Sequence, residues 1–239
     1  MTTHESFALL VLAAAIHASF QLSVSMLTIL SGHALSAKTA NTRLLGLSIS
    51  FASGVASMIA LSLALISLLL ANIFYSSVPR IVWAAVCGLM VGVGVAIWTY
   101  YYRHQSRGTI LWLPRGFARY LSERTKKTST RQESFGLGLV SVIAEYLFCL
   151  APLIVGGLIL QNLTPPLQIL GLTLYVAIAV LPLVVIIMLL GSGHSLAVIQ
   201  KWRETNKRFL QFAAGSALVI LGGYIYVSMV IAAGSQGNL

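Results

Sequence analysis

Acidic residues are scarce in this chain of 239 residues. It has no aspartate and only five glutamates, and charged residues of both signs make up 8% of the sequence. A soluble domain has about 25% charged residues, whereas 58% of this chain is hydrophobic. The composition therefore excludes an ordinary soluble domain and predicts an all-α integral membrane protein.

Common catalytic motifs are also missing. The sequence has no nucleophile elbow, no HExxH segment and no GxxxxGKS or GxxxxGKT segment, so the usual signatures of hydrolases, zinc proteases and P-loop enzymes are absent. Cys149 with His17 is the one nucleophile–base pair available inside the apolar segments, and no second carboxylate accompanies Glu145 there. We therefore do not expect an enzyme.

Six apolar segments have about the 20 residues that a helix needs to cross the hydrocarbon core. These predicted spans are residues 7–31, 45–71, 81–102, 135–160, 167–191 and 209–233. The first has no basic segment before it and is too long for the apolar region of a signal peptide. We therefore expect it to be a retained transmembrane helix.

The net charge of +10 is unevenly distributed. All but one of the 15 basic residues lie in segments 32–44, 103–134 and 192–208, and the exception is Arg80. Because basic residues concentrate in cytoplasmic loops, these segments are predicted to be cytoplasmic, with both termini outside the plasma membrane. The charge thus indicates topology, and nucleic acid is not an expected partner.

The loop 103–134 interleaves basic residues with Trp112, Phe117 and Tyr120. This pattern favours a helix lying on the inner leaflet, where anionic lipid attracts each basic residue by about 1 kcal/mol. The alternative is an ordinary solvated basic linker.

The same loop divides the chain into residues 1–102 and 135–239, each with three spans. Halves with an odd number of spans run in opposite directions, which is the arrangement of two inverted three-helix repeats. Residues 13–25 align with residues 141–153 without a gap, and this alignment places His17 on Glu145. The sequence therefore predicts a repeat whose equivalent positions carry the two intramembrane ionisable residues.

Glu145 and His17 are the central candidates for function. A carboxylate inside a span costs roughly 2.5–3.5 kcal/mol on insertion scales, and such residues usually face a bundle interior or a water-filled path. Spacing of four places Gln21 and Ser25 on the face of His17, and Cys149 on that of Glu145. Two such faces would form one polar pocket.

Two chemistries suit this pocket. Imidazole, carboxylate and thiolate from His17, Glu145 and Cys149 suit Zn, Ni, Mn or Fe, and proton coupling through the His–Glu pair is the other reading. A hydrogen bond between His17 and Glu145 that merely holds two spans together is the structural alternative.

Helix breakers follow Glu145 in the fourth span. Pro152, Gly156 and Gly157 predict a kinked or discontinuous helix that serves as a hinge, with a simple packing kink as the alternative. The segment SGH occurs twice, so His33 and His194 are candidate inner-gate residues. Each is alternatively an interfacial histidine at a glycine-capped helix end.

The segments KRFLQFAAGSALVILGGYIYV and FCLAPL resemble the six-span LysE/DsbD-like superfamily, which includes amino-acid exporters, divalent-metal exporters and CcdA-type thiol carriers. FCLAPL is similar to the CcdA PCxxP element, with Cys149 and Pro152 at the matching separation. Where CcdA-type proteins have a cysteine in the first span, this chain has Gln21. The resemblance implies a transporter fold and leaves the substrate open.

We therefore expect alternating-access transport of a small cation, divalent metals included, or of a small polar solute. The first alternative is a CcdA-like redox protein that acts through Cys149 with a partner thiol protein. The second is a scaffold or accessory subunit that transports nothing. The sequence specifies neither a cofactor nor an oligomeric state.

Overall fold

The computed structural model describes residues 2–20, 26–27, 41–74, 78–101, 123–125, 127–192, 201 and 205–232. Within these residues the regular structure is entirely helical, which confirms the all-α prediction. The elements in chain order are α1 (Thr3–Ser19), α3 (Asn41–Ile73), α4 (Arg80–Ala96), η1 (Ile97–Tyr101), α6 (Arg131–Leu160), α7 (Pro165–Gly191), α9 (Lys207–Tyr226) and η2 (Val227–Ile231).

Five stretches of these helices are long and apolar enough to cross a membrane. They are Thr42–Ile73, Arg80–Thr99, Arg131–Leu160, Pro165–Gly191 and Arg208–Ile231. They agree with five of the predicted spans and support an integral membrane protein. The remaining prediction, residues 7–31, begins in α1 and continues into residues outside the described part of the chain.

The outer surface of the helices is strongly apolar. Leu61, Leu147 and Met188 are each more than three-fifths exposed, on three different helices. Soluble monomers rarely carry large continuous apolar surfaces, whereas lipid tails solvate such side chains at no cost. The exposed leucines and isoleucines are therefore the lipid-facing surface of the bundle.

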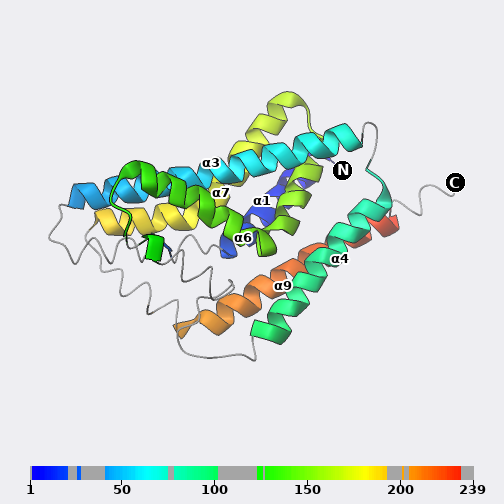
Figure 1. The fold of residues 1–239 in the computed structure, drawn as a ribbon. Helices are drawn as coiled ribbons and strands as arrows, with labels where there is room; N and C mark the ends of the chain where they lie inside the picture. Colours follow the sequence, from blue (N-terminus) through cyan, green and yellow to red (C-terminus); the bar gives the residue numbers. More distant parts are fainter. Residues whose placement is uncertain are drawn as a thin grey trace.

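Helix α6 lies at the centre of the fold. In its most apolar stretch 67% of the residues are buried, against 28–33% in the other spans. It packs along α3 and also contacts α1, α4 and α7. Figure 1 shows α4 and α9 as a pair beside the group formed by α1, α3, α6 and α7. The side chains of α6 are therefore the best shielded from lipid.

Helices α3 and α6 run in the same direction and touch through their backbones. A Cβ atom added to Gly54 would lie 2.2 Å from the carbonyl oxygen of Phe135, and one added to Gly138 would lie 2.2 Å from that of Phe51. Small residues allow this approach, which dispersion and interhelical polar contacts stabilise in a membrane. The Gly54–Gly138 crossing fixes α6 relative to α3.

Hydrogen bonds at the starts of α3 and α6 fix the same alignment. The hydroxyl of Ser134 donates to the carbonyl oxygen of Leu47 at 2.8 Å, and that of Ser50 donates to the carbonyl oxygen of Arg131 at 2.6 Å. The Arg43 guanidinium donates to the carbonyl oxygen of Ser129 at 3.1 Å. The polar ends of α3 and α6 therefore meet at one end of the bundle.

Helices α4 and α9 run antiparallel and are also joined by glycines. A Cβ atom on Gly94 would lie 2.8 Å from the carbonyl oxygen of Gly215, and one on Gly222 would lie 3.3 Å from that of Cys87. The ring of Trp98 stacks on that of Phe212, with centroids 5.9 Å apart. These contacts make α4 and α9 a closely packed pair.

Capping boxes start α1 and α6. The side chains of Thr2 and Thr130 accept from the backbone N–H groups of Glu5 and Glu133, whose carboxylates accept from the cap residues in return. This arrangement satisfies N–H groups that the first turn leaves unpaired. It explains why α6 begins at Arg131, earlier than the predicted residue 135.

Replacing Thr130 with alanine is expected to lower the free energy of unfolding by about 1 kcal/mol, because the N-cap acceptor of α6 is lost. Denaturant titration of the detergent-solubilised protein measures this change. Thr173→Ala is the control, since the Thr173 hydroxyl bonds only within its own helix, to the carbonyl oxygen of Ile169. An equal loss in both variants would contradict the capping account.

The predicted discontinuity at Pro152 is not found, because α6 continues through this residue to Leu160. Likewise, α7 continues through Pro182. A proline removes one backbone hydrogen bond and clashes with the preceding turn, but in a membrane protein neighbouring helices and side chains can satisfy the backbone groups that it frees. Contacts with α3 on both sides of Pro152, at Gly138 and Gly156, hold α6 together.

Candidate functional site

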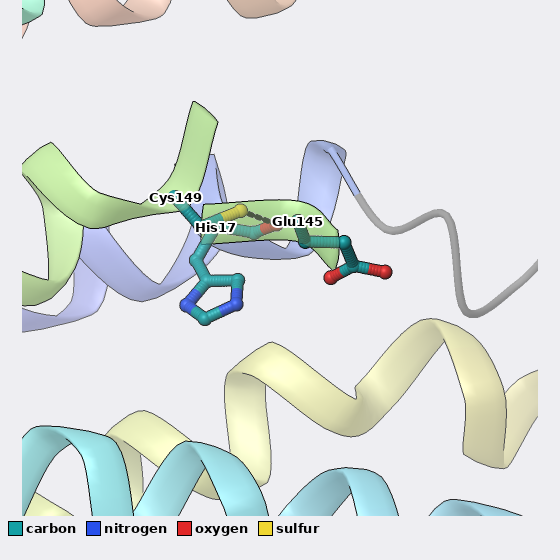
Figure 2. A group of neighbouring side chains, drawn as sticks. All are labelled: His17, Glu145 and Cys149. Carbon is teal, nitrogen blue, oxygen red and sulfur yellow. Dashed lines mark hydrogen bonds between the residues drawn. The ribbon is translucent and has the colours of Figure 1, made fainter. Parts of the chain in front are cut away.

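The structure brings together the three residues that the sequence proposed as metal ligands. His17 comes from α1, whereas Glu145 and Cys149 come from α6, and one ligand atom from each lies within 4.8 Å of the others. All three side chains are buried, with Glu145 2% exposed and the other two fully enclosed. Figure 2 shows the imidazole between the two α6 side chains and α7.

Simple features of the sequence position these side chains. Glu145 and Cys149 are four residues apart, so successive turns of α6 present them on one face. His17 lies in the last turn of α1. The Cys149 thiol donates to the main-chain carbonyl oxygen of His17 over 4.0 Å, the contact drawn as a dashed line in Figure 2. The end of α1 is thus held against the middle of α6.

Tyr175 of α7 is a fourth member of the site that the sequence analysis missed. Its hydroxyl lies 3.1 Å from Nδ1 of His17, and the two rings meet edge to face with centroids 5.8 Å apart. Tyr175 is completely buried. The available signal was a tyrosine in the middle of the otherwise apolar fifth span, facing the same core as His17.

The second imidazole nitrogen has a different environment. Nε2 of His17 is buried and has no hydrogen-bond partner among the described residues. Because Nδ1 contacts Tyr175, neither nitrogen forms the His17–Glu145 hydrogen bond that the structural alternative required. The structural alternative in its stated form, a hydrogen bond between His17 and Glu145, is therefore not found among the described residues.

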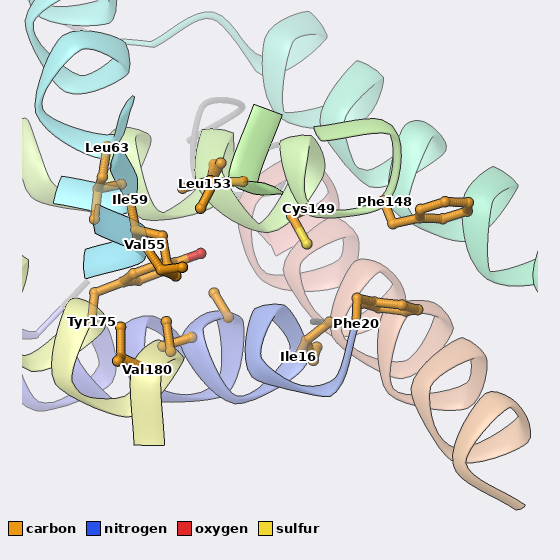
Figure 3. Packing of buried hydrophobic residues seen from close by; sticks show 14 of the residues in the cluster. Ile16, Phe20, Val55, Ile59, Leu63, Phe148, Cys149, Leu153, Tyr175 and Val180 are labelled. Atoms are coloured by element: carbon orange, nitrogen blue, oxygen red, sulfur yellow. The ribbon is translucent and has the colours of Figure 1, made fainter. Parts of the chain in front are cut away.

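Apolar side chains surround the cluster. Figure 3 shows Val55 and Ile59 beside Tyr175, and Leu153 between them and Cys149; all belong to the buried apolar core. At one end Phe20 of the α1 C-terminus stacks on Phe148 of α6, with centroids 6.1 Å apart and planes inclined by 20°. These apolar walls lower the local dielectric, so a charge bound here interacts strongly with the side chains that face it.

Four of the predicted site residues lie outside the described part of the chain. They are Gln21 and Ser25, proposed as neutral ligands, and His33 and His194, proposed as inner-gate residues. Most of the proposed lipid-binding loop, residues 103–122 and residue 126, also lies outside it. These assignments stay predictions.

The predicted hinge glycines contact neighbouring helices. A Cβ atom on Gly156 would lie 3.0 Å from Leu63 of α3 and 3.2 Å from the Tyr175 ring, and one on Gly157 would lie 2.7 Å from Ile66. Close packing explains why both residues are small. Gly156 also places α6 directly against the tyrosine that contacts His17, which connects the proposed hinge with the site.

The two cysteines are not joined. Cys87 and Cys149 are both free and buried, and Cys87 lies in α4, where its backbone contacts Gly222 of α9. The group that includes Cys149 contains His17 and Glu145 as its other members. The donor set of the site is thus one nitrogen, one carboxylate and one sulfur, which suits a borderline transition-metal ion better than thiol–disulfide exchange.

No protein family, curated protein or solved structure that was compared with this chain matches it significantly. The resemblance to the LysE/DsbD-like superfamily therefore stays a prediction.

Proposed function

We propose that this protein transports a small cation across the membrane, with His17, Glu145 and Cys149 as the binding site and a divalent metal ion as the preferred cargo. The observation that carries this proposal is the convergence of three different metal-ligating side chains at one buried point between two helices. Ionisable residues within transmembrane bundles commonly mark ion pathways.

The helix arrangement supports an inverted repeat of α1, α3 and α4 with α6, α7 and α9. Exchanging the two halves replaces α1 by α6, α3 by α7 and α4 by α9. The α1–α7 contact then corresponds to the α6–α3 contact, and the α1–α9 contact corresponds to the α6–α4 contact. All four contacts occur. The α1–α6, α3–α7 and α4–α9 contacts convert into themselves and also occur, whereas the α6–α7 contact has no counterpart of similar size between the described residues of α1 and α3. Such symmetry is the basis of alternating access in many transporters.

Individual residues follow the same symmetry. His17 lies as far along the chain from its cap residue Thr2 as Glu145 lies from Thr130. The same shift relates Phe20 to Phe148, and these two rings stack on each other, as residues beside a two-fold axis would. In the proposed repeat, the site and the aromatic pair belong to the boundary between the two halves, the usual position of a transporter's substrate site.

The charge distribution supports the proposed orientation in a plasma membrane. Arg43 and Arg131 lie at the starts of α3 and α6, and Arg208 at the start of α9, whereas Arg80 begins the antiparallel α4. The positive-inside rule then places the starts of α3, α6 and α9 in the cytoplasm. Both termini lie outside in this arrangement, with segments 32–44, 103–134 and 192–208 inside.

The redox alternative has weaker support. A CcdA-like relay needs a second cysteine beside Cys149 and access for a partner thiol protein, but Cys149 is fully enclosed and Cys87 belongs to a different helix contact. The alternative of a scaffold or accessory subunit does not explain why three metal-ligating side chains meet at one buried point.

A thermal-stability screen of the purified protein in detergent tests the proposal. Mono- and divalent cations are added in turn to the wild type, to Glu145→Gln and to Glu133→Gln, an exposed residue at the start of the same helix. A cation at 100 times its dissociation constant should stabilise the protein by about 2.7 kcal/mol. We expect stabilisation of the wild type and Glu133→Gln alone. If no cation stabilises the wild type, the proposal is wrong.

A further inference from the structure

We propose that the site selects a thiophilic divalent ion of the zinc and cobalt class, and that Tyr175 is a positioning residue that directs Nε2 of His17 to this ion. This inference rests on the cation-transport proposal and specifies its cargo. Its basis is the donor set, the environment of the two imidazole nitrogens and the placement of Tyr175 on a third helix, α7.

The spacing of the donors is close to that of a zinc site. Bonds of about 2.0–2.3 Å in a tetrahedral site place ligand atoms roughly 3.3–3.8 Å apart. The atoms of His17, Glu145 and Cys149 lie within 4.8 Å of one another, so each needs to move by only a fraction of that distance.

The chemical types of the donors exclude hard cations as preferred cargo. Calcium takes six to eight oxygen ligands, and magnesium takes octahedral oxygen ligands and keeps several waters. Among the described residues, the group contains a single carboxylate, which stands beside an imidazole and a thiol. Imidazole suits zinc, nickel and copper, and thiolate selects the softer members of this series.

Tyr175 determines which imidazole nitrogen faces the ion. A metal-binding histidine normally donates its second N–H to an oxygen acceptor, which fixes its tautomer and ring orientation. Here Nδ1 of His17 lies 3.1 Å from the Tyr175 hydroxyl oxygen, which is that acceptor in the tautomer that carries its proton on Nδ1. The lone pair is then on Nε2, the buried nitrogen without a described partner. The edge-to-face contact of the two rings holds this orientation.

A metal site with three protein ligands suits a transported ion, because the ion has to be released again. Structural zinc sites close the tetrahedron with four protein ligands, whereas sites with three leave one position open. Among the described residues, the His17, Glu145 and Cys149 set leaves such a position, through which an ion exchanges its last water or meets a further ligand such as the predicted Gln21. Tyr175 orients the imidazole of His17 and is not itself a ligand of the ion.

Cobalt(II) binding to the detergent-solubilised full-length protein tests the donor set. A thiolate ligand gives a sulfur-to-cobalt charge-transfer band in the near ultraviolet, and a tetrahedral site gives strong visible bands. We expect both in the wild type and in Cys87→Ser, and loss of the charge-transfer band in Cys149→Ser. Persistence of that band in Cys149→Ser, or its loss in Cys87→Ser alone, would overturn the assignment.

The wild type alone provides a second test that needs no variant to fold. X-ray absorption of the zinc-loaded protein should show one sulfur at about 2.3 Å and nitrogen or oxygen neighbours at about 2.0–2.1 Å. A shell of oxygen atoms only would overturn the inference. In that case the transport proposal survives if another cation stabilises the wild type in a Glu145-dependent way, and it fails if none does.

Tyr175→Phe tests the positioning role, because it keeps the ring and removes only the hydroxyl. Loss of such a partner typically weakens metal affinity 10–100-fold, and we expect this weakening in a cobalt titration with the charge-transfer band retained. A purely packing role for Tyr175 predicts unchanged affinity, and that result would overturn the positioning assignment. Tyr146→Phe is the control, since the Tyr146 hydroxyl bonds Ser62 outside the site.

Discussion

Replacing Glu145 with glutamine is expected to abolish cation transport. The substitution keeps the size of the side chain and removes the one carboxylate of the described cluster, which is 2% exposed. Removing one partner of a buried charge pair typically costs 3–5 kcal/mol, which corresponds to a loss of affinity of at least about 100-fold. Uptake of radioactive zinc into proteoliposomes should fall to the rate of protein-free vesicles.

Glu133→Gln provides the matched control for this experiment. Glu133 lies at the exposed start of α6, and glutamine can replace glutamate in a capping box. This variant should transport at the rate of the wild type. Equal uptake by the wild type and Glu145→Gln would show that the buried carboxylate is not part of the ion pathway.

The second large effect is expected at the crossing of α3 and α6. Leucine at position 138 would place its Cβ 2.2 Å from the carbonyl oxygen of Phe51 and 3.0 Å from the backbone nitrogen of Val55. Neither neighbour is a side chain that can rotate away, so the helices have to separate. Overpacking typically lowers the free energy of unfolding by about 1–3 kcal/mol and occasionally by more. We expect Gly138→Leu to lower it by more than about 3 kcal/mol.

The same helix offers the control for this substitution. A Cβ atom on Gly136 would meet nothing within 4 Å, so Gly136→Leu should unfold at nearly the temperature of the wild type. Thermal unfolding in detergent, together with the yield of monodisperse protein, compares the two variants. Similar behaviour of both would mean that the Gly54–Gly138 crossing does not determine the packing of the bundle.

The sequence was sufficient to predict much of the site. His17 and Glu145 stood out because charge is expensive within apolar spans, and the spacing of four connected Glu145 with Cys149. The meeting of α1 with α6 was expected because two polar helix faces within a membrane bundle can form one pocket, and the structure brings His17, Glu145 and Cys149 together. Each of these arguments uses a local pattern or the strong energetic penalty of a buried polar group.

Tyr175 could not be found in the same way. A tyrosine is tolerated in an apolar span, and its role depends on which nitrogen of His17 it contacts across two helices. The crossing of Gly54 and Gly138 was also missed, because glycines are frequent in membrane helices and only the structure shows which pair of them touches. Contacts between distant segments are the information that local patterns lack.

The break in the helix that was predicted as one possibility at Pro152 is not found, for a related reason. A proline alone favours a break, but α6 packs against α3 before and after this residue, and the helix remains continuous. The helix starts were displaced from the predicted ones because apolar patterns ignore caps: Thr2 and Thr130 begin α1 and α6 within polar sequence. Tertiary packing and capping therefore determine where the helices begin and end, and five of the predicted spans agree with the structure.

Zinc counterflow in proteoliposomes is the most direct test of the central claim that the buried cluster is the site of a cation transporter. Vesicles containing the wild-type protein are loaded with unlabelled zinc and diluted into a trace of radioactive zinc. Alternating access predicts transient accumulation of label above its external concentration, and none in vesicles with Glu145→Gln. Equal label in wild-type and protein-free vesicles, for zinc and for every other cation tried, would contradict the account.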